Sequence, residues 1–443
     1  MLWQPSLPEK YLSMSSADLC ASITARRATL GTSLVILGHH YQTDEVIRHA
    51  DFTGDSLKLS QLAAEIANGD AITRQNPAPN LSDAGPVQYV IFCGVHFMAE
   101  TADMLTGGQL AVILPDLSAG CSMADMASYD DTLVAWETIH SCLNVAAGPT
   151  GKWAGRVIPI TYVNSSAAIK AFVGQNGGAC CTSSNAAAVF KWAMSQGGPG
   201  EEVKILFLPD QHLGRNTAAA FGIDVARHSC VYDPRLARRG EELGGATQEQ
   251  IIESKVILWA GHCSVHKLFR PEHCEQIRAA EASLPSTERT QILVHPECSK
   301  EVVDLADLTG STEFIIQTIN KAPAGSKWSV GTEVHLVNRL ANVAKAKGVS
   351  VRILSDCQCL CTTMFRIDEP HILWVLDNLC GVFEKPSSAL SQTPMPLAAP
   401  HEPARGRAKI VNQVSVLPEV RAGAMLALQR MLQLSNRAGV AVE

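Results

Sequence analysis

Short apolar runs that end in polar clusters recur along this 443-residue sequence and limit the folds that it can adopt. Eight runs have this form: SLVILGHHYQ, YVIFCGVHF, AVILPD, IPITYVNSS, KILFLPDQH, VILWAGHC, QILVHPEC and VRILSDC. Stretches of helical character lie between them, including 56–67, 101–105 and 332–346. Strands that alternate with helices indicate βαβ units, so the sequence predicts an α/β fold with mainly parallel sheets.

The polar clusters that follow these runs are the expected places for chemistry. Ligands of parallel sheets collect at the carboxyl ends of the strands. The sequence has neither the glycine pattern of a dinucleotide-binding fold nor a phosphate-binding P-loop. From their composition, 68–86 and 232–250 are interpreted as surface insertions. A linker rich in Pro, Ser and Ala is predicted after residue 383, followed by a helix at 418–434.

Composition excludes two classes of partner. Hydrophobic residues make up 46% and charged residues 18% of the chain, and the formal net charge is -7, which argues against binding to nucleic acid. Apolar runs are of strand length and fall short of the roughly 18 residues of a membrane span, so no membrane partner is expected. The first residues, MLWQPSLPEKYLSM, lack a secretion signal, and the expected location is the cytoplasm.

Three of the fourteen cysteines occupy predicted loops: Cys121 in AGCSMAD, Cys263 in WAGHCSVH and Cys361 in CQCLCTTM. They are too far apart for a local zinc motif, so each would come from a different part of the fold. Three converging thiolates would fit three corners of a 4Fe-4S cluster and leave the fourth iron open. The alternatives are three unrelated buried thiols, or tetrahedral zinc with water, His266 or His295 as the fourth ligand.

Longer motifs resemble the quinolinate synthase family. HHYQ at 39–42, ADFTGDS at 50–56 and CGVHFMAETA at 93–102 carry the resemblance first. Further blocks continue it in order: AGCSMAD, ITYVNSSAAIKA, CCTSSNA, FLPDQHLG, LWAGHCSVH, LVHPEC, ADLTGST, GTEVHLVNRL and CTTM. Together they extend from about residue 35 to about residue 380. No single block decides the matter, but so many in one order are very specific.

The resemblance implies a fold of three similar three-layer α/β/α units in pseudo-threefold arrangement around a central active site. The expected domains are 30–121 with 362–385, then 122–264, then 265–361, with a linker and helical extension at 386–443. The implied reaction condenses iminoaspartate with dihydroxyacetone phosphate to quinolinate, phosphate and water in NAD biosynthesis. Iminoaspartate is unstable, so functional coupling to an aspartate-oxidising enzyme is also expected.

The resemblance also implies roles for individual residues. Cys121, Cys263 and Cys361 would bind the 4Fe-4S cluster, whose open iron would act as a Lewis acid. Tyr41, His295 and Glu297 would transfer protons, since an imidazole beside a carboxylate suits acid/base chemistry near neutral pH. The residues expected to bind substrate are His39, Ser56, Tyr162, Asn164, Ser183, Ser184, His266, Ser311 and Thr312.

Other interpretations of these residues and of the whole chain remain open. The Ser and Thr hydroxyls would equally serve as helix N-caps, and His266 would equally be a supporting histidine with satisfied hydrogen bonds. A non-enzymatic iron-sulfur protein would usually present four cysteine ligands rather than three. Within enzymes, the alternative is another cluster-dependent hydro-lyase acting on a small hydroxy acid.

The CQCLC segment generates a first prediction. Cys357, Cys359 and Cys361 lie so close together in sequence that any one of them could be the third ligand of the cluster. Cys361 is chosen because CTTM resembles the family's final ligand motif and a following helix would stabilise its thiolate. Anaerobically prepared Cys361→Ser is expected to lose the 4Fe-4S absorption and the activity, whereas Cys357→Ser and Cys359→Ser each retain both. A full cluster in Cys361→Ser together with its loss in Cys359→Ser would overturn this choice.

Overall fold

A computed structural model describes residues 3–70, 72–77, 85–148, 151–383, 404–405 and 408–437. The chain divides into two compact units. Unit 1 comprises Met1–Thr53, Gln61–Ala119 and Thr363–Ser415, and unit 2 comprises Gly54–Ser60, Gly120–Thr362 and Val416–Glu443. None of the described helices is both long enough and apolar enough to cross a membrane.

Unit 1 is built on a four-stranded sheet in the order β2-β1-β3-β4. The strands are β1 (Leu34–His39), β2 (Phe52–Gly54), β3 (Tyr89–Cys93) and β4 (Ala111–Ile113), and β3 pairs in parallel with both β1 and β4. Its helices are α1 (Glu9–Leu12), α2 (Ser16–Leu30), α3 (Asp44–Ile47), α5 (His96–Leu105) and α18 (Glu369–Leu379), with short 3-10 turns at Gly31–Ser33 and Met364–Arg366. A small antiparallel pair joins β14 (Val382–Phe383) to β15 (Ala404–Arg405).

Unit 2 contains two parallel sheets. The first has the order β6-β5-β7-β9-β8, formed by β5 (Gly155–Tyr162), β6 (Ala179–Cys181), β7 (Glu202–Leu208), β8 (Ser229–Tyr232) and β9 (Val256–Trp259). The helices associated with it are α6 (Ser122–Asp125), α7 (Tyr129–Ala146), α8 (Ala167–Gln175), α9 (Ala186–Met194), α10 (Gln211–Ala220), α11 (Val225–His228), α12 (Pro234–Ala237) and α13 (Gln248–Glu253). The long helix α4 (Ser56–Ala67) begins in unit 2 and continues into unit 1.

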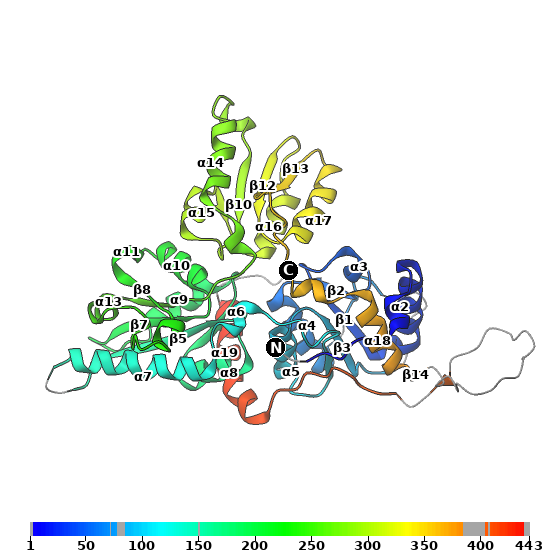
Figure 1. Ribbon diagram of the computed structural model, residues 1–443, viewed down its shortest axis with the longest axis horizontal. Coiled ribbons are helices and arrows are strands. Elements are labelled where there is room, and N and C mark those ends of the chain that lie inside the picture. Colours follow the sequence, from blue (N-terminus) through cyan, green and yellow to red (C-terminus); the bar gives the residue numbers. More distant parts are fainter. Residues whose placement is uncertain are drawn as a thin grey trace, which may run out of the picture. The chain divides into compact units, whose positions relative to one another are not determined.

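The second sheet of unit 2 has the order β11-β10-β12-β13. Its strands are β10 (Gln291–Val294), β11 (Leu308–Thr309), β12 (Lys327–Gly331) and β13 (Ser350–Ile353). Its helices are α14 (Pro271–Ala280), α15 (Lys300–Leu305), α16 (Thr312–Asn320) and α17 (Val334–Lys345), with 3-10 turns at His266–Leu268 and Ser286–Glu288. Figure 1 shows α14 and α15 beside β10, and α17 beside β12 and β13.

The predicted α/β fold with mainly parallel sheets is confirmed, and three such sheets are present in the described chain. Every predicted run overlaps an observed strand, and the helix predicted at 56–67 has the same bounds as α4. The pseudo-threefold arrangement and the three domain boundaries stay predictions. The first predicted domain, 30–121 with 362–385, largely overlaps unit 1. The other two, 122–264 and 265–361, both fall in unit 2.

The predicted insertions and extension have different outcomes. Described residues of 68–86 are mostly exposed, although 71 and 78–84 lie outside the described residues. In 232–250, Tyr232 is buried in β8, but most of the segment after it is exposed. The predicted linker lies largely in 384–403 and 406–407, which are outside the described residues. The helix predicted at 418–434 is confirmed as α19 (Pro418–Arg437).

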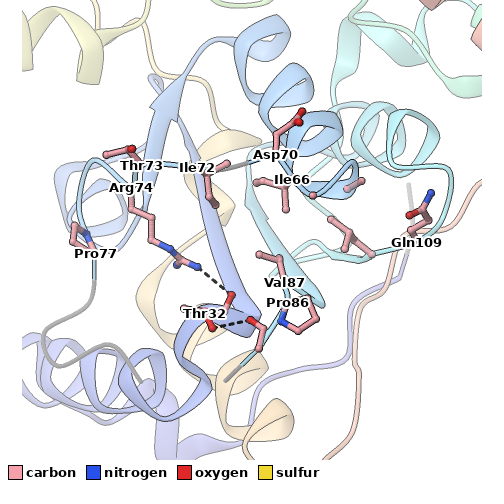
Figure 2. Close-up of a pocket in the computed structure, with 14 residues that line it drawn as sticks. Thr32, Ile66, Asp70, Ile72, Thr73, Arg74, Pro77, Pro86, Val87 and Gln109 are labelled. Atoms are coloured by element: carbon pink, nitrogen blue, oxygen red, sulfur yellow. Dashed lines mark hydrogen bonds between the residues drawn. The ribbon is translucent and has the colours of Figure 1, made fainter. Parts of the chain in front are cut away.

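One pocket lies in unit 1 beside the first sheet (Figure 2). Thr32 and Arg74 line it, and the hydroxyl of Thr32 donates a hydrogen bond to the carbonyl oxygen of Gly85 at 2.8 Å. The Arg74 guanidinium bonds the carbonyl of Leu34 at 2.7 Å and the carboxylate of Asp51 at 3.0 Å. Since this cation is already paired and no predicted site residue lines the pocket, we assign it no part in the chemistry.

The crossing of α8 and α19 generates a stability prediction. A Cβ added at Gly174 of α8 would collide with the backbone carbonyl oxygen of Gly423 in α19 and approach the Ala427 nitrogen to 3.0 Å. Gly174→Ala is therefore expected to lower the free energy of unfolding by about 1 to 3 kcal/mol, measured by chemical denaturation. Gly198→Ala is the control, since its Cβ would meet only the flexible Glu201 side chain. Equal stability of the two variants would contradict the tight crossing.

Candidate active site

The ends of strands in both sheets of unit 2 carry polar side chains that meet around one carboxylate, Glu297. Tyr162 is the last residue of β5, and Glu297 follows β10 in the HPE motif. The Glu297 side chain is 3% exposed. The Tyr162 hydroxyl donates a hydrogen bond to it, and His266 Nδ1 lies 2.8 Å from its Oε2. A buried carboxylate is stable only with such partners.

Partners keep Glu297 ionised despite its burial. Burial acts to raise the pKa of Glu297, but the neighbouring His266, together with hydrogen bonds from His266 and Tyr162, outweighs it and holds the pKa below its usual range. A carboxylate that accepts several hydrogen bonds favours its charged form. Glu297 is therefore a carboxylate near neutral pH. It can accept a proton, and it has none to donate until it has accepted one.

The imidazole of His295 is neutral. Burial, followed by the influence of His266, lowers the pKa of His295 to about 3. Its Nδ1 accepts a hydrogen bond from the Glu297 backbone N–H at 3.3 Å and lies 3.9 Å from the Glu297 carboxylate. The two predicted acid/base groups are thus adjacent, although the closer imidazole to the carboxylate is that of His266.

His266 supports Glu297. Its second nitrogen, Nε2, lies 3.2 Å from the hydroxyl of Thr332, and its ring stacks on that of His295 with centroids 4.5 Å apart and planes inclined by 19°. Both ring nitrogens therefore have protein partners, as expected for a histidine that orients a carboxylate. Thr332 was not singled out from the sequence, because a Thr that follows a strand carries no specific signal.

A second unforeseen residue, Asn216 of α10, fixes the loop that carries Glu297. Its Nδ2 donates to the carbonyl oxygens of Pro296 at 2.8 Å and of Cys298 at 2.9 Å, one on each side of Glu297. Asp210, the N-cap of α10, is close enough to Glu297 for the two carboxylates to repel each other. Burial and then Glu297 raise the pKa of Asp210 well above its usual value.

The three predicted ligand cysteines all belong to unit 2. They are close enough for the charge of one thiolate to affect the pKa of another. Burial raises the pKa of Cys121 to about 12, with Cys361 adding to it and the backbone N–H groups of Ala124 and Met123 acting against it. Burial, followed by Glu297, raises the pKa of Cys263 well above its usual value, and Cys361 and Cys121 contribute. The thiol of Cys263 lies within 4.8 Å of the Glu297 carboxylate. Three loops far apart in sequence therefore bring their thiols close enough for their charges to interact.

The surroundings of Cys361 separate it from the other two thiols of CQCLC. Its backbone N–H lies 3.4 Å from Oε1 of Glu333, a fully buried carboxylate that also caps α17. Cys357 is exposed, and Cys359 is buried in an apolar cluster against which Cys361 is packed. The structure thus gives the three cysteines different environments, with Cys361 grouped with Cys121 and Cys263.

Polar residues expected to bind substrate lie at other strand and helix ends of unit 2. Asn164 follows β5, and its Oδ1 is buried with no hydrogen-bond partner among the described residues. Ser183 and Ser184 are half-buried between β6 and α9. Ser311 caps α16 by accepting the Phe314 N–H at 3.3 Å, so the capping role is met there.

The remaining members of the predicted set differ in position. Thr312 is the buried first residue of α16, and Ser56 is the half-buried first residue of α4. His39 and Tyr41 belong to unit 1, where His39 ends β1 and its Nδ1 accepts the Tyr41 N–H at 3.1 Å. Their rings meet edge to face with centroids 4.8 Å apart.

Two groups of residues in the described chain have donor atoms close enough to hold a metal ion. They are Cys263 with His266 and Glu297, and Cys20 with His49 and Glu369; within each group the donor atoms lie within 4.8 Å of one another. The second group lies in unit 1. There His49 Nε2 and Arg48 Nη2 each lie 2.6 Å from the same oxygen of Glu369. We assign it to the packing of α18, because a cation and an imidazole already satisfy that carboxylate.

Comparison with known proteins bears on this site. A family model described as quinolinate synthetase A protein matches residues 22–74 and 80–399. The chain belongs to the quinolinate synthase family. A quinolinate synthase of Acidobacterium capsulatum is 45% identical over 96% of this chain and 95% of its own length. Those of Nocardioides sp. and Herpetosiphon aurantiacus are 47% and 43% identical, over 96% and 97% of this chain and 91% and 96% of their own lengths. Quinolinate synthases are enzymes, so the expected enzyme class is confirmed.

The contacts of Glu297 generate a prediction for catalysis. Glu297→Gln keeps the size of the side chain but removes the negative charge that accepts a proton. Turnover is expected to fall by about 100-fold or more, with the iron-sulfur absorption unchanged. Glu301→Gln, the same change at an exposed position of α15, is the matched control. Near-normal turnover of Glu297→Gln would remove this residue from the mechanism.

Proposed function

We propose that the protein condenses iminoaspartate with dihydroxyacetone phosphate to quinolinate, phosphate and water in NAD biosynthesis. Membership of the quinolinate synthase family supports the product. One observation carries the proposal for the site: thiols from three distant loops are close enough for their charges to interact, and two of them, Cys121 and Cys263, also interact with the buried carboxylate of Glu297. We propose Cys121, Cys263 and Cys361 as ligands of a 4Fe-4S cluster.

The donor set fits such a cluster. The three thiols share one region, and backbone N–H groups are directed at two of them: those of Ala124 and Met123 at Cys121, and that of His266 at Cys263. Hydrogen bonds to cysteine sulfur tune iron-sulfur clusters, and a coordinated thiol is deprotonated even where burial disfavours the free thiolate. When bound, a cluster with three protein ligands supplies a Lewis acid at its fourth iron, which makes hydroxide a better leaving group.

The chain's own residues would bind the substrates and move protons. Both substrates are anions, whereas the protein has a formal net charge of -7, so recognition must be local. Asn164, Ser183 and Ser184 would donate hydrogen bonds to substrate oxygens, as would Ser56, Ser311 and Thr312. The N–H groups at the start of α9 and α16 favour negative charge at the same places. His39 and Tyr41 are proposed as a further substrate-binding residue and a further proton-transfer residue.

Glu297 is proposed as the base that takes a proton from the substrate during tautomerisation and returns it to a leaving hydroxide; before the second water leaves, it takes another proton from the substrate in the same way. His266 holds its Oε2 at 2.8 Å, while Tyr162 holds the carboxylate from β5, so the accepting oxygen is oriented before substrate binds. His295, neutral and stacked on His266, would relay a proton without adding charge to the site. Pre-oriented groups lower the barrier because no reorganisation accompanies the reaction.

The setting of the reaction is also proposed. None of the fourteen cysteines, all of which lie among the described residues, forms a disulfide, which suits a reducing compartment such as the cytoplasm. Iminoaspartate is unstable in water, so an aspartate-oxidising enzyme is proposed as its supplier.

Anaerobic purification with metal and sulfide analysis tests the proposal. A 4Fe-4S cluster predicts about four iron and four sulfide per chain. Quinolinate should form from iminoaspartate and dihydroxyacetone phosphate only in the cluster-loaded protein. Stoichiometric zinc without sulfide would favour a zinc site at Cys263, His266 and Glu297 and would exclude the cluster. A loaded protein that makes no quinolinate would exclude the proposed reaction.

A further inference from the structure

The helix α19 lies beyond residue 399, where the match to the family model ends, and yet it reaches the predicted substrate loop. It contacts α8, β6 and α9, the elements that surround the loop at 182–185. Figure 1 shows α19 beside α8. Its contact with α8 is close, because glycines face each other where the helices cross, at Gly174 and Gly423.

A chain of buried hydrogen bonds leads from the end of α19 into this loop. The Ser435 hydroxyl donates to the carbonyl oxygen of Met431 at 2.9 Å, so its hydrogen is already used. The oxygen of Ser435 therefore accepts, and it receives Nδ2 of Asn185 at 2.7 Å. Ser435 is 0% exposed and Asn185 1% exposed, so water cannot take either place.

This bond decides which way the Asn185 amide faces. With Nδ2 directed at Ser435, Oδ1 faces the loop and accepts the Thr182 backbone N–H at 2.6 Å and lies 3.3 Å from the Thr182 hydroxyl. Asn185 is also the residue at the N-cap of α9. Its side chain thus spans the two residues between Thr182 and itself, Ser183 and Ser184, and fixes their backbone.

A second contact fixes the segments on both sides of the loop. Arg430 of α19 donates a hydrogen bond to the carbonyl oxygen of Gly178, just before β6. The same guanidinium lies 5.3 Å from the ring centroid of Trp192 in α9. Cation–π contacts of this kind are favourable. α19 therefore holds the chain before and after the loop as well as the loop itself.

We infer that α19 is a positioning element for substrate binding, acting through Ser435 and Asn185 on the hydroxyls of Ser183 and Ser184. The inference rests on the proposed function, in which those hydroxyls bind a carboxylate or phosphate of the substrates. α19 itself touches no reacting atom in this scheme. Its effect is on affinity, because it keeps the loop in the shape that binds the anion before the substrate arrives.

Ser435→Ala tests the inference. The Asn185 amide loses its acceptor, so its orientation is no longer held and Thr182 loses a fixed partner. The KM for at least one substrate is expected to rise roughly fivefold, the effect of about one hydrogen bond, with kcat within twofold and iron content unchanged. In the Asn185→Ala background, Ser435→Ala should add no further change in KM, since the two residues act in one chain.

Leu428→Ala is the matched control for a purely structural role. Leu428 is a fully buried apolar residue of α19, and its truncation lowers stability without removing a polar group. It should lower the thermal midpoint at least as much as Ser435→Ala while leaving both KM values unchanged. Equal KM increases in the two variants would overturn the inference, because stability alone would then explain the effect.

Ser183→Ala with Ser184→Ala separates this inference from the proposed function. If that double variant raises KM and Ser435→Ala does not, the role of α19 is overturned while the substrate role of the loop stands. If neither changes KM, the loop binds no substrate and the inference fails with it. A wild-type protein that forms no quinolinate would overturn the proposed function itself.

Discussion

Parallel strand pairing is the constraint on which the rest of this structure depends. In a parallel sheet all carboxyl ends lie along one edge, so the loops after β5, β6, β7 and β9 emerge together, as do those after β10 and β12. These loops carry Tyr162, Asp210 and Cys263 from one sheet and Glu297 from the other. Most elements of the site are therefore far apart in sequence, because the sheets bring the loops together.

The burial of Glu297 gives the site its chemical character. An unpaired carboxylate inside a protein is costly, so the fold must surround it with donors, and it does so with groups from different elements. His266 comes from the 3-10 turn after Cys263, and Tyr162 comes from β5. Asn216 of α10 donates hydrogen bonds to the loop on both sides of Glu297. The same groups that stabilise the carboxylate also fix its direction, so the requirements of stability and of the proposed proton transfer coincide here.

The sequence predicted what is local and missed what is long-range. The eight apolar runs overlap strands, whereas β2, β6, β8, β11, β12, β14 and β15 were not predicted, because most of them are short or, like KWSVG of β12, mix small and polar residues. HPE correctly suggested an imidazole beside Glu297. It could not reveal that the closer imidazole, that of His266, lies 31 positions earlier in the sequence. Nor could it reveal the hydrogen bond from Asn216 to the loop that carries Glu297. Such pairings depend on how helices pack, which periodicity does not encode.

The bond between Asn185 and Ser435 has a consequence for biosynthesis, since 250 positions separate the two residues. At a synthesis rate of about 5 to 20 residues per second, Ser435 is made about 12 to 50 s after Asn185. The parallel sheet around β5 and β7 can form in that interval, but the 182–185 loop still lacks its last partner. A nascent chain can therefore be folded at its core while the 182–185 loop still lacks its contact with α19.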